Sequence, residues 1–292
     1  MKSLTEFFAE TTSFQRVYQS IGQHWTQLIT GLAGSGRTLF LASLLKEQPR
    51  QILIVAQNLF HANQMMEDLT GIVPEEQLHL FPADEVIHAE MAFASPETRA
   101  ERIATLTFLM SGKPGIVVVP LSGVRKILPP KEVLTSAYLT VQLGTDLELS
   151  QTAAQLVAIG YQREQMVASP GEFSIRGGIL DIYPLTEEHP VRIELFDTEV
   201  DSLRYFDPES QRSIKNIEEL TVLPATDRIY PAELLQNAAD DFSDRIQHQV
   251  ALIKDEQEKD LLKKNMTFLL DAMKEGEPVE GLTPFAGLIY PK

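Results

Sequence analysis

The hydrophobic pattern of this chain changes its period part-way along the sequence. Up to about residue 130, short apolar runs alternate with longer stretches of helical spacing, which is typical of βαβ units around a mainly parallel sheet. The predicted strands are residues 27–32, 52–56, 78–81 and 116–119. A helix is predicted over residues 58–69, and Ser95 followed by Pro96 should cap a second helix that ends near Met110. We therefore expect a doubly wound α/β domain here.

After Pro129 and Pro130 the period becomes two, as in antiparallel strands with one buried face. The alternation is clearest over residues 172–183, 191–196 and 201–206, with one predicted helix over residues 146–159. Residues 232–274 are helical in pattern and highly charged. This last segment is expected to bury little by itself, through Leu252, Leu261, Leu262, Phe268 and Leu269.

Composition limits the classes of function. A chain of 292 residues with 43% hydrophobic residues can bury a sizeable core, and its length is typical of about two domains. The net charge of -16 repels the DNA backbone on average, so DNA binding would need a local basic patch, and no long Lys/Arg run occurs. The sequence has no cysteine, no apolar run near the roughly 20 residues of a membrane span, and no signal-peptide core at its start. A cytoplasmic protein without a membrane partner is expected.

A glycine-rich motif follows the first predicted strand. The sequence GLAGSGRT at residues 31–38 has the spacing of a nucleotide-binding P-loop, but Arg37 stands where that motif has lysine. Lysine brings a compact charge to the phosphates, whereas the arginine fork is planar and wider and fits poorly there. We expect a P-loop-like turn with impaired chemistry, formed by Gly31, Gly34, Ser35, Gly36, Arg37 and Thr38.

An ATPase also needs an acidic residue at the end of an apolar strand to hold magnesium. The best such strand, GIVVVP, ends in Pro120 and Leu121, and the alternative pair Asp84 and Glu85 follows a weaker strand that turns at Pro82. The six histidines are scattered without the spacing of metal ligands. No catalytic residue, metal or cofactor is therefore expected. Weak nucleotide binding, or a weak P-loop ATPase, is the alternative from the enzyme class.

Three strings in the second part occur in a recognisable order. They are GYQREQMV at residues 160–167, SPGEFSIRGGILDIYP at 169–184 and VRIELFDTEVDSLRYFD at 191–207. Together with the altered P-loop, and with FPADE followed by ASPETRAERIATL, they resemble the amino-terminal region of the bacterial transcription-repair coupling factor family (Mfd). The resemblance covers nearly all of the chain. That region is similar in turn to the excision-repair protein UvrB.

The resemblance implies a three-part fold. Its parts are a P-loop-like domain over residues 1–135, an inserted small α+β domain over 136–225, and a partial, largely helical third domain over 226–292. It also implies a longer protein, whose other regions bind RNA polymerase and DNA and contain a translocase motor that uses ATP and magnesium. The present part is expected to be a non-catalytic recruitment module that imitates UvrB and binds UvrA, the damage-sensing ATPase.

The UvrA contact of UvrB falls on four positions of this chain: Arg163, Arg176, Arg192 and Glu194. Arg176 and Arg192 are the expected anchors, and Ser174 replaces one further arginine of UvrB. Alternation supports this surface, because Ser174 and Arg176 share one strand face, as do Arg192 and Glu194. If the two strands pair, the charges cluster and suit carboxylates on a protein partner. The alternative is an ordinary solvated sheet face, with Arg192 and Glu194 in loose salt bridges to residues on other strands.

UvrB also holds DNA with a tyrosine-rich hairpin in its first domain. The corresponding residues 81–97 of this chain are acidic and contain no tyrosine, so the aromatic side chains that stack on bases are missing. Little DNA affinity is expected, and Phe81 and Phe93 are expected to pack in the core. A DNA-binding module is the second alternative, and it predicts an affinity that falls steeply with salt.

Overall fold

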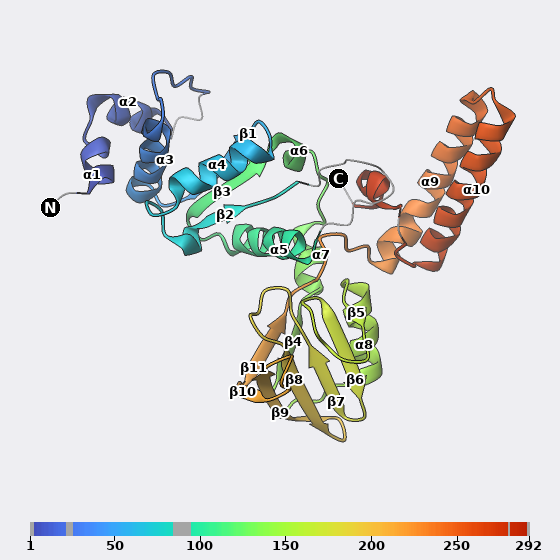
Figure 1. Cartoon of the computed structure of the whole chain (residues 1–292). Helices are drawn as coiled ribbons and strands as arrows, with labels where there is room; N and C mark the ends of the chain where they lie inside the picture. Colours follow the sequence, from blue (N-terminus) through green and yellow to red (C-terminus); the bar gives the residue numbers. More distant parts are fainter. Residues whose placement is uncertain (1–2, 22–25, 84–94, 280, 291–292) are drawn as a thin grey trace. The chain divides into compact units, whose positions relative to one another are not determined.

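The chain has a mixed α/β architecture with parallel and antiparallel sheets. The computed structural model describes residues 3–21, 26–83, 95–279 and 281–290. The chain divides into two compact units, Met1–Lys126 and Ile127–Lys292 (Figure 1). The predicted boundaries at residues 135 and 225 stay predictions. None of the described helices is both long and apolar enough to cross a membrane.

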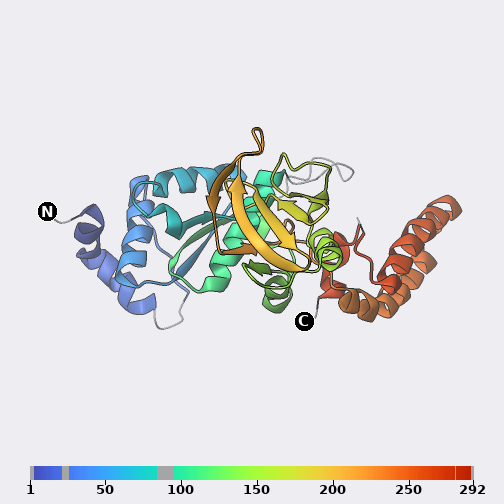
Figure 2. The same ribbon diagram turned by 90° about the horizontal axis from the view of Figure 1, so that it is seen from below.

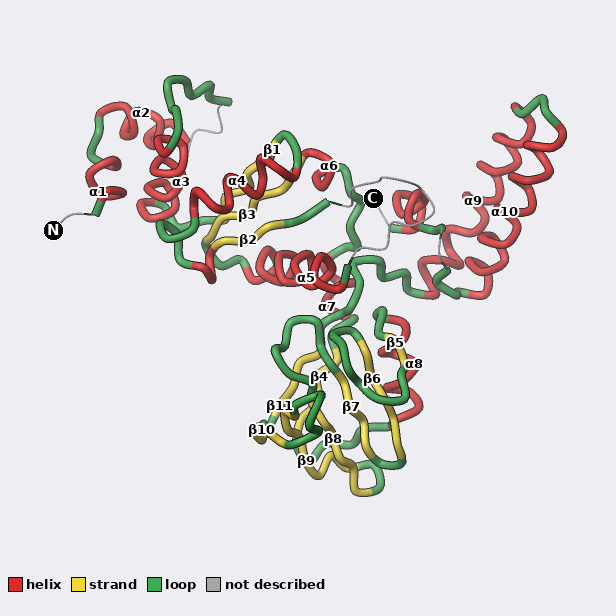
Figure 3. Tube along the Cα trace, viewed as in Figure 1, coloured by secondary structure: helices red, strands yellow, loops and turns green. Residues whose placement is uncertain are grey.

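A three-stranded parallel sheet lies at the centre of the first unit. Its strands have the order β1-β3-β2 and confirm three of the four predicted strands: β1 (Gln51–Ala56), β2 (Leu78–Leu80) and β3 (Gly115–Pro120). Helices α3 (Ser35–Glu47) and α4 (Leu59–Leu69) pack on one face, and α5 (Pro96–Ser111) packs on the other (Figure 3). Every residue of β3 is buried because the strand is central and covered on both faces.

Helices α4 and α5 begin where the sequence predicts, because a side chain caps each. Asn58 Oδ1 accepts a hydrogen bond from the His61 N–H at 3.0 Å, and Ser95 Oγ accepts one from the Thr98 N–H at 3.2 Å. Pro96 takes the first helical position of α5, where its missing N–H has no consequence. Gly112 ends α5 in the left-handed conformation, with φ of 66°.

Shorter helices complete the first unit. α1 (Leu4–Ala9) and α2 (Thr12–Ile21) pack on α3 through Phe14, Phe40 and Leu44. A capping box begins α1, since Ser3 and Glu6 each accept the backbone N–H of the other. The 3₁₀ turn η1 (Glu75–Gln77) precedes β2, and α6 (Leu121–Val124) follows β3.

Residues 27–32 do not form the predicted strand. The central strand β3 already has a neighbour on each side, so a fourth strand would have to pair at an open edge of the sheet, and these residues pair with neither edge. Leu28 is 91% exposed, and Leu53 and Val55 are exposed on β1. The prediction was wrong because a short apolar run indicates burial but does not supply a hydrogen-bonding neighbour.

The second unit contains a six-stranded sheet, whose strands appear yellow to orange in Figure 2. The order is β10-β9-β8-β7-β6-β5, and all pairs are antiparallel except β5 with β6. The predicted alternating segments are confirmed as strands. The bounds are β5 (Gln162–Arg163), β6 (Glu172–Arg176), β7 (Ile179–Ile182), β8 (Val191–Phe196), β9 (Glu199–Phe206) and β10 (Ser213–Asn216).

Two further strands and two helices belong to the same unit. β4 (Leu139–Gln142) pairs antiparallel with β11 (Glu219–Val222), and α7 (Lys131–Ser136) precedes β4. The predicted helix over 146–159 is α8 (Leu149–Ala158). It begins later than predicted because Glu148 is the N-cap, and its carboxylate accepts the N–H groups of Ser150 and Gln151 at 3.2 and 2.8 Å.

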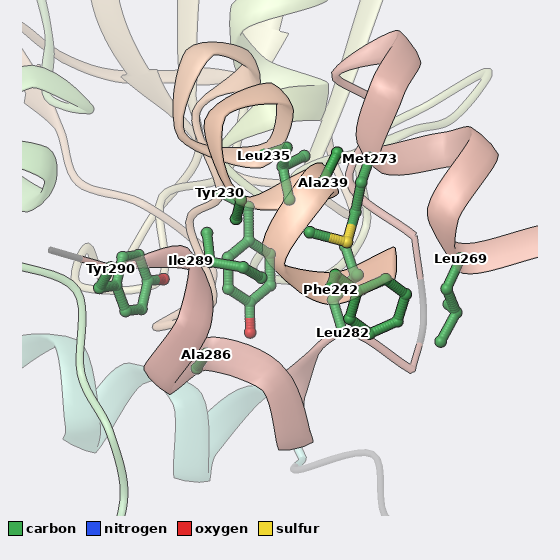
Figure 4. Close-up of a cluster of buried hydrophobic side chains, with 11 residues drawn as sticks. Tyr230, Leu235, Ala239, Phe242, Leu269, Met273, Leu282, Ala286, Ile289 and Tyr290 are labelled. Atoms are coloured by element: carbon green, nitrogen blue, oxygen red, sulfur yellow. The ribbon is translucent and has the colours of Figure 1, made fainter. Parts of the chain in front are cut away.

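The helical part has a core of its own, which corrects the expectation that it buries little. It consists of α9 (Ala232–Leu252), α10 (Glu256–Glu275), η2 (Thr283–Phe285) and α11 (Ala286–Ile289). Figure 4 shows Leu235, Phe242, Met273 and Leu282 converging, and each is at most 1% exposed. By contrast, Leu252, Leu261 and Phe268 are more than 60% exposed, at 63%, 61% and 62%. The prediction missed the contribution of residues after 274 and chose three positions on the wrong helix faces.

Candidate functional site

Strand register gives the six-stranded sheet one apolar and one polar face. Opposed residues in paired strands point to the same side. One cross-strand row is therefore Ser174, Asp181, Arg192 and Arg204, and the next is Arg176, Ile179, Glu194 and Ser202. We call these two rows the polar face. The alternating residues point to the other side of the sheet, and they include Phe173, Leu180, Ile193 and Leu203, each at most 1% exposed.

Asp181 lies at the centre of the polar face and joins two arginines. Its carboxylate accepts hydrogen bonds from Arg192 Nε and Nη2 at 2.6 and 2.8 Å, and from Arg176 Nη2 at 2.9 Å. Its side chain is only 1% exposed. Strands β6 and β8 do not pair directly, because β7 lies between them. Asp181 on β7 therefore links the two expected anchors, Arg176 on β6 and Arg192 on β8.

Arg192 is held inside the structure by contacts on several sides. Besides the fork on Asp181, its Nη2 donates to Gln211 Oε1 at 2.8 Å, and its guanidinium carbon lies 4.5 Å from the centre of the Phe206 ring. The hydrogen bond to Asp181 raises the pKa of Arg192 above its ordinary value, with burial acting in the opposite direction. Only 16% of its side chain is exposed. Arg192 thus has few donors left for a partner.

Arg176 is the more accessible of the two. Its side chain is 50% exposed, and its one hydrogen bond to Asp181 uses a single nitrogen of a group with five N–H donors. The two-residue turn at Gly177 and Gly178, with Gly177 at φ of 61°, places it at the end of β6. Arg176 therefore presents most of its fork to the solvent.

Glu194 pairs with Arg204 rather than with Arg192. Its carboxylate accepts a hydrogen bond from Arg204 Nη2 and another from the Ser202 hydroxyl at 3.1 Å. The hydrogen bond from Arg204 is the main cause that lowers the pKa of Glu194, and the same bond raises the pKa of Arg204. Arg192 and Glu194 therefore form the cross-strand salt bridges that the alternative interpretation expects, Arg192 with Asp181 on β7 and Glu194 with Arg204 on β9.

Comparison with known proteins gives these strands a family. The family model described as the UvrB interaction domain matches residues 139–227, which begin at the first residue of β4 and end after β11. The chain is 38% identical over its whole length to the transcription-repair-coupling factor of Bacillus subtilis (strain 168), and 40% identical over 83% of its length to that of Staphylococcus aureus (strain Mu50 / ATCC 700699). This chain is homologous to the amino-terminal region of the transcription-repair-coupling factors. It spans 25% and 20% of these two relatives.

The four residues transferred from UvrB all lie in the segment that matches the UvrB interaction domain, but the structure brings only three of them together. Arg163 is exposed on β5, and its register partner is Phe173. Phe173 alternates with Ser174 and Arg176 along β6, so it points to the opposite side of the sheet from them. Strand β5 is the last strand of the sheet and pairs with β6. Arg163 is therefore near one edge of the sheet and outside the polar face.

Ser174 is confirmed on the polar face, but it is buried there. Its side chain is 1% exposed, and its hydroxyl has no hydrogen-bond partner among the described atoms. Its register partner is Asp181. The position at which the resemblance to UvrB implies an arginine is therefore covered in this chain.

Sequence analysis missed three residues in or beside the polar face: Asp181, Phe196 and Arg204. Phe196 is 79% exposed at the end of β8. Along this strand it follows Arg192 and Glu194 at every second position, which is the spacing of residues on one strand face. The alternation of the sequence alone could therefore have placed Phe196 on the same strand face as Arg192 and Glu194. Asp181 and Arg204 gave no such signal, because their importance depends on which strands are neighbours.

The six residues of the predicted P-loop-like turn lie in a glycine-containing loop and at the start of the helix that follows it. Gly31 and Gly34 have φ of 83° and 51°, and α3 begins at Ser35 and contains Gly36, Arg37 and Thr38. Thr38 is 2% exposed, and Arg37 lines a cavity of about 670 Å³ with Phe40 and His61. The loop has no β-strand directly before it, since residues 26–33 are irregular. This differs from the strand, loop and helix order of a P-loop.

Other candidate features of the chain lie outside the polar face. A cavity of about 1040 Å³ in the helical part is lined mostly by apolar residues such as Phe242, Leu262 and Leu288. Among the described residues, no group of three or more His, Asp or Glu side chains could hold a metal ion. Most of the predicted counterpart of the UvrB hairpin, residues 84–94 with Phe93, lies outside the described residues. Phe81 is 4% exposed, which confirms its core position.

Proposed function

We propose that this chain is a non-catalytic recruitment module that imitates UvrB and binds UvrA through the polar face of its UvrB interaction domain. The observation that carries the proposal is the half-exposed Arg176 fork, fixed on a buried carboxylate within a domain of that family. In a longer coupling factor, the module would bring UvrA to a stalled RNA polymerase. Polymerase and DNA binding, and a motor that uses ATP and magnesium, would then belong to other regions.

The chemistry of the polar face suits a protein partner with carboxylates. Arginine forks bind carboxylates through paired hydrogen bonds and are enriched at interface hot spots. Phe196 adds an exposed aromatic ring on the same face, two residues from Glu194. A local pair of arginines on a chain with net charge -16 favours an acidic protein patch over a nucleic acid, which would meet repulsion elsewhere.

Titration calorimetry of the chain against UvrA tests the proposal. Arg176→Glu reverses the charge of a half-exposed side chain, and we expect binding to weaken by about thirtyfold or more. Because the variant also loses the hydrogen bond to Asp181, its unchanged folding is checked by circular dichroism first. The matched control is Lys215→Glu, the same charge reversal at an exposed position of β10 whose register partner, Tyr205, is outside the two polar rows. Loss of affinity in Arg176→Glu alone supports the proposed function. Equal binding by both variants and the parent would move the interface to another surface.

A further inference from the structure

Asp181 is an unusual residue for an exposed sheet face. It is 1% exposed, yet it is charged and lies in the middle of the polar face, with Arg192 directly opposite on β8 and Arg176 reaching across from β6. A buried carboxylate is unfavourable unless it is paired and hydrogen-bonded, and here three hydrogen bonds from two guanidinium groups meet that need. The arrangement therefore fixes two arginines relative to one another.

We propose that Asp181 is a positioning residue of the docking face: it fixes Arg176 for contact with UvrA, and Arg192 acts through Asp181 rather than as the main contact. This inference rests on the proposed function. Asp181 itself is covered, so it cannot contact a partner directly. Its influence on binding must therefore pass through the arginines it holds.

The contacts of Arg192 and Arg176 differ in the way this proposal requires. Arg192 uses Nε and Nη2 within the sheet, stacks on Phe206 and is 16% exposed, so it serves to hold the Asp181 carboxylate. Arg176 donates one hydrogen bond to that oriented carboxylate and remains half exposed. An arginine fixed before binding loses less conformational entropy when the partner arrives.

Charge balance across the strands supports the same role. Arg192 and Arg204 are direct register partners, and like charges in that relation repel. Asp181 neutralises the first arginine and Glu194 neutralises the second, each from a neighbouring position. Without Asp181, Arg192 would face Arg204 uncompensated, and both guanidinium groups would be expected to move away from one another.

The central experiment is the isosteric variant Asp181→Asn, with affinity for UvrA measured by calorimetry at a temperature where the variant is fully folded. We expect the Kd to rise by about tenfold, with a smaller further effect of Arg176→Ala when it is combined with Asp181→Asn than in the parent. Glu218→Gln is the control, since it removes the same charge from an exposed position of the same unit. A merely structural carboxylate would lower stability but would leave the affinity of the folded chain unchanged.

A second readout does not depend on UvrA. In the free chain, NMR should find the Arg192 Nε–H slow to exchange with water in the parent and fast in Asp181→Asn. Parent protein that fails to bind UvrA would overturn the proposed function, and the exchange measurement would still decide whether Asp181 fixes the arginines. Unchanged affinity, additive losses with Arg176→Ala, or unchanged exchange would each overturn the positioning role.

A further variant keeps the test decisive if Asp181→Asn does not fold. Arg192→Lys retains the charge but cannot hold both carboxylate oxygens of Asp181 with a fork. We expect a loss of affinity close to that of Arg192→Ala. Parent-like binding by Arg192→Lys would show that the fork on Asp181 is not needed, and would overturn the proposal.

Discussion

Arg192 lies over the face of the Phe206 ring, with its guanidinium carbon 4.5 Å from the ring centre. The Phe206 ring is 1% exposed and covers one face of the Arg192 guanidinium, while the Asp181 carboxylate accepts hydrogen bonds at the edge of that guanidinium. A cation above an aromatic face is stabilised by the ring quadrupole, by about 0.5–2 kcal/mol depending on desolvation. The polar face is therefore built on a hydrophobic support as well as on charge pairs.

The two phenylalanines of this region should respond differently to the same substitution. Phe206→Leu removes a buried ring and its contact with Arg192, so the free energy of unfolding should fall by about 1–3 kcal/mol. Phe196→Leu changes a side chain that is 79% exposed and should change stability by less than about 0.5 kcal/mol. Urea denaturation of the two variants measures both values. Equal destabilisation would contradict the placement of Phe206 beneath Arg192.

The Glu194–Arg204 pair predicts a stability that depends on pH. The pKa of Glu194 is lowered from its ordinary value of 4.5, chiefly by the hydrogen bond from Arg204. A carboxylate with a lowered pKa in the folded state stabilises that state above pH 4.5, and this contribution is lost as the pH falls through the folded-state pKa. The effect should stay below about 1 kcal/mol, because Glu194 is partly exposed and its charge is screened by solvent.

Urea denaturation at several pH values checks this expectation. The difference in unfolding free energy between the parent and Glu194→Gln should be present at neutral pH and disappear in acid. In an Arg204→Met background, where the partner is missing, Glu194→Gln should have little effect at any pH. A difference that grows as the pH falls would show that the sign is wrong.

Features that depend on residues close together in the sequence were predicted correctly, whereas features that depend on strand pairing were not. The start of α4 near Asn58, the cap at Ser95 and the alternation of β8 depend on residues a few positions apart, and all three were predicted. The partner of Glu194 is Arg204, ten positions later and across a hairpin, so it depends on register. Asp181 lies in the apolar string ILDIYP and became a central residue only because β7 separates β6 from β8.

The third part of the chain offers a test of core placement. Phe242 is 1% exposed and packs edge-on against Phe285, with ring centres 4.8 Å apart, whereas Leu261 is 61% exposed. Phe242→Ala should destabilise the helical part by about 3–5 kcal/mol, and Leu261→Ala should change it by less than about 0.5 kcal/mol. Hydrogen exchange at the amides of α9 and α10 measures this part separately from the strands. Stronger loss of protection in Leu261→Ala would contradict the observed core.

The sequence missed this core for a physical reason. Helical spacing over residues 232–274 indicates an apolar face, but a helix pair can bury either of two neighbouring faces. Leu282, Ala286 and Ile289 lie beyond the predicted segment, and they belong to the same buried cluster as Phe242 and Met273. A pattern confined to the two long helices could not include them.

The altered P-loop gives the last prediction: restoring its lysine should not create an ATPase. Arg37→Lys recovers the motif spacing, but residues 27–32 form no strand before the loop, and β3 ends in Pro120 where a magnesium-binding acid would be needed. We expect magnesium-dependent phosphate release from ATP to stay at background in both the parent and Arg37→Lys. Release that appears with Arg37→Lys and is lost again with Thr38→Ala would mean that the loop adopts a working geometry. The missing strand and the missing acid would then not explain the inactivity of the parent, and Arg37 alone would account for it. Binding of UvrA through the second unit would remain a separate question.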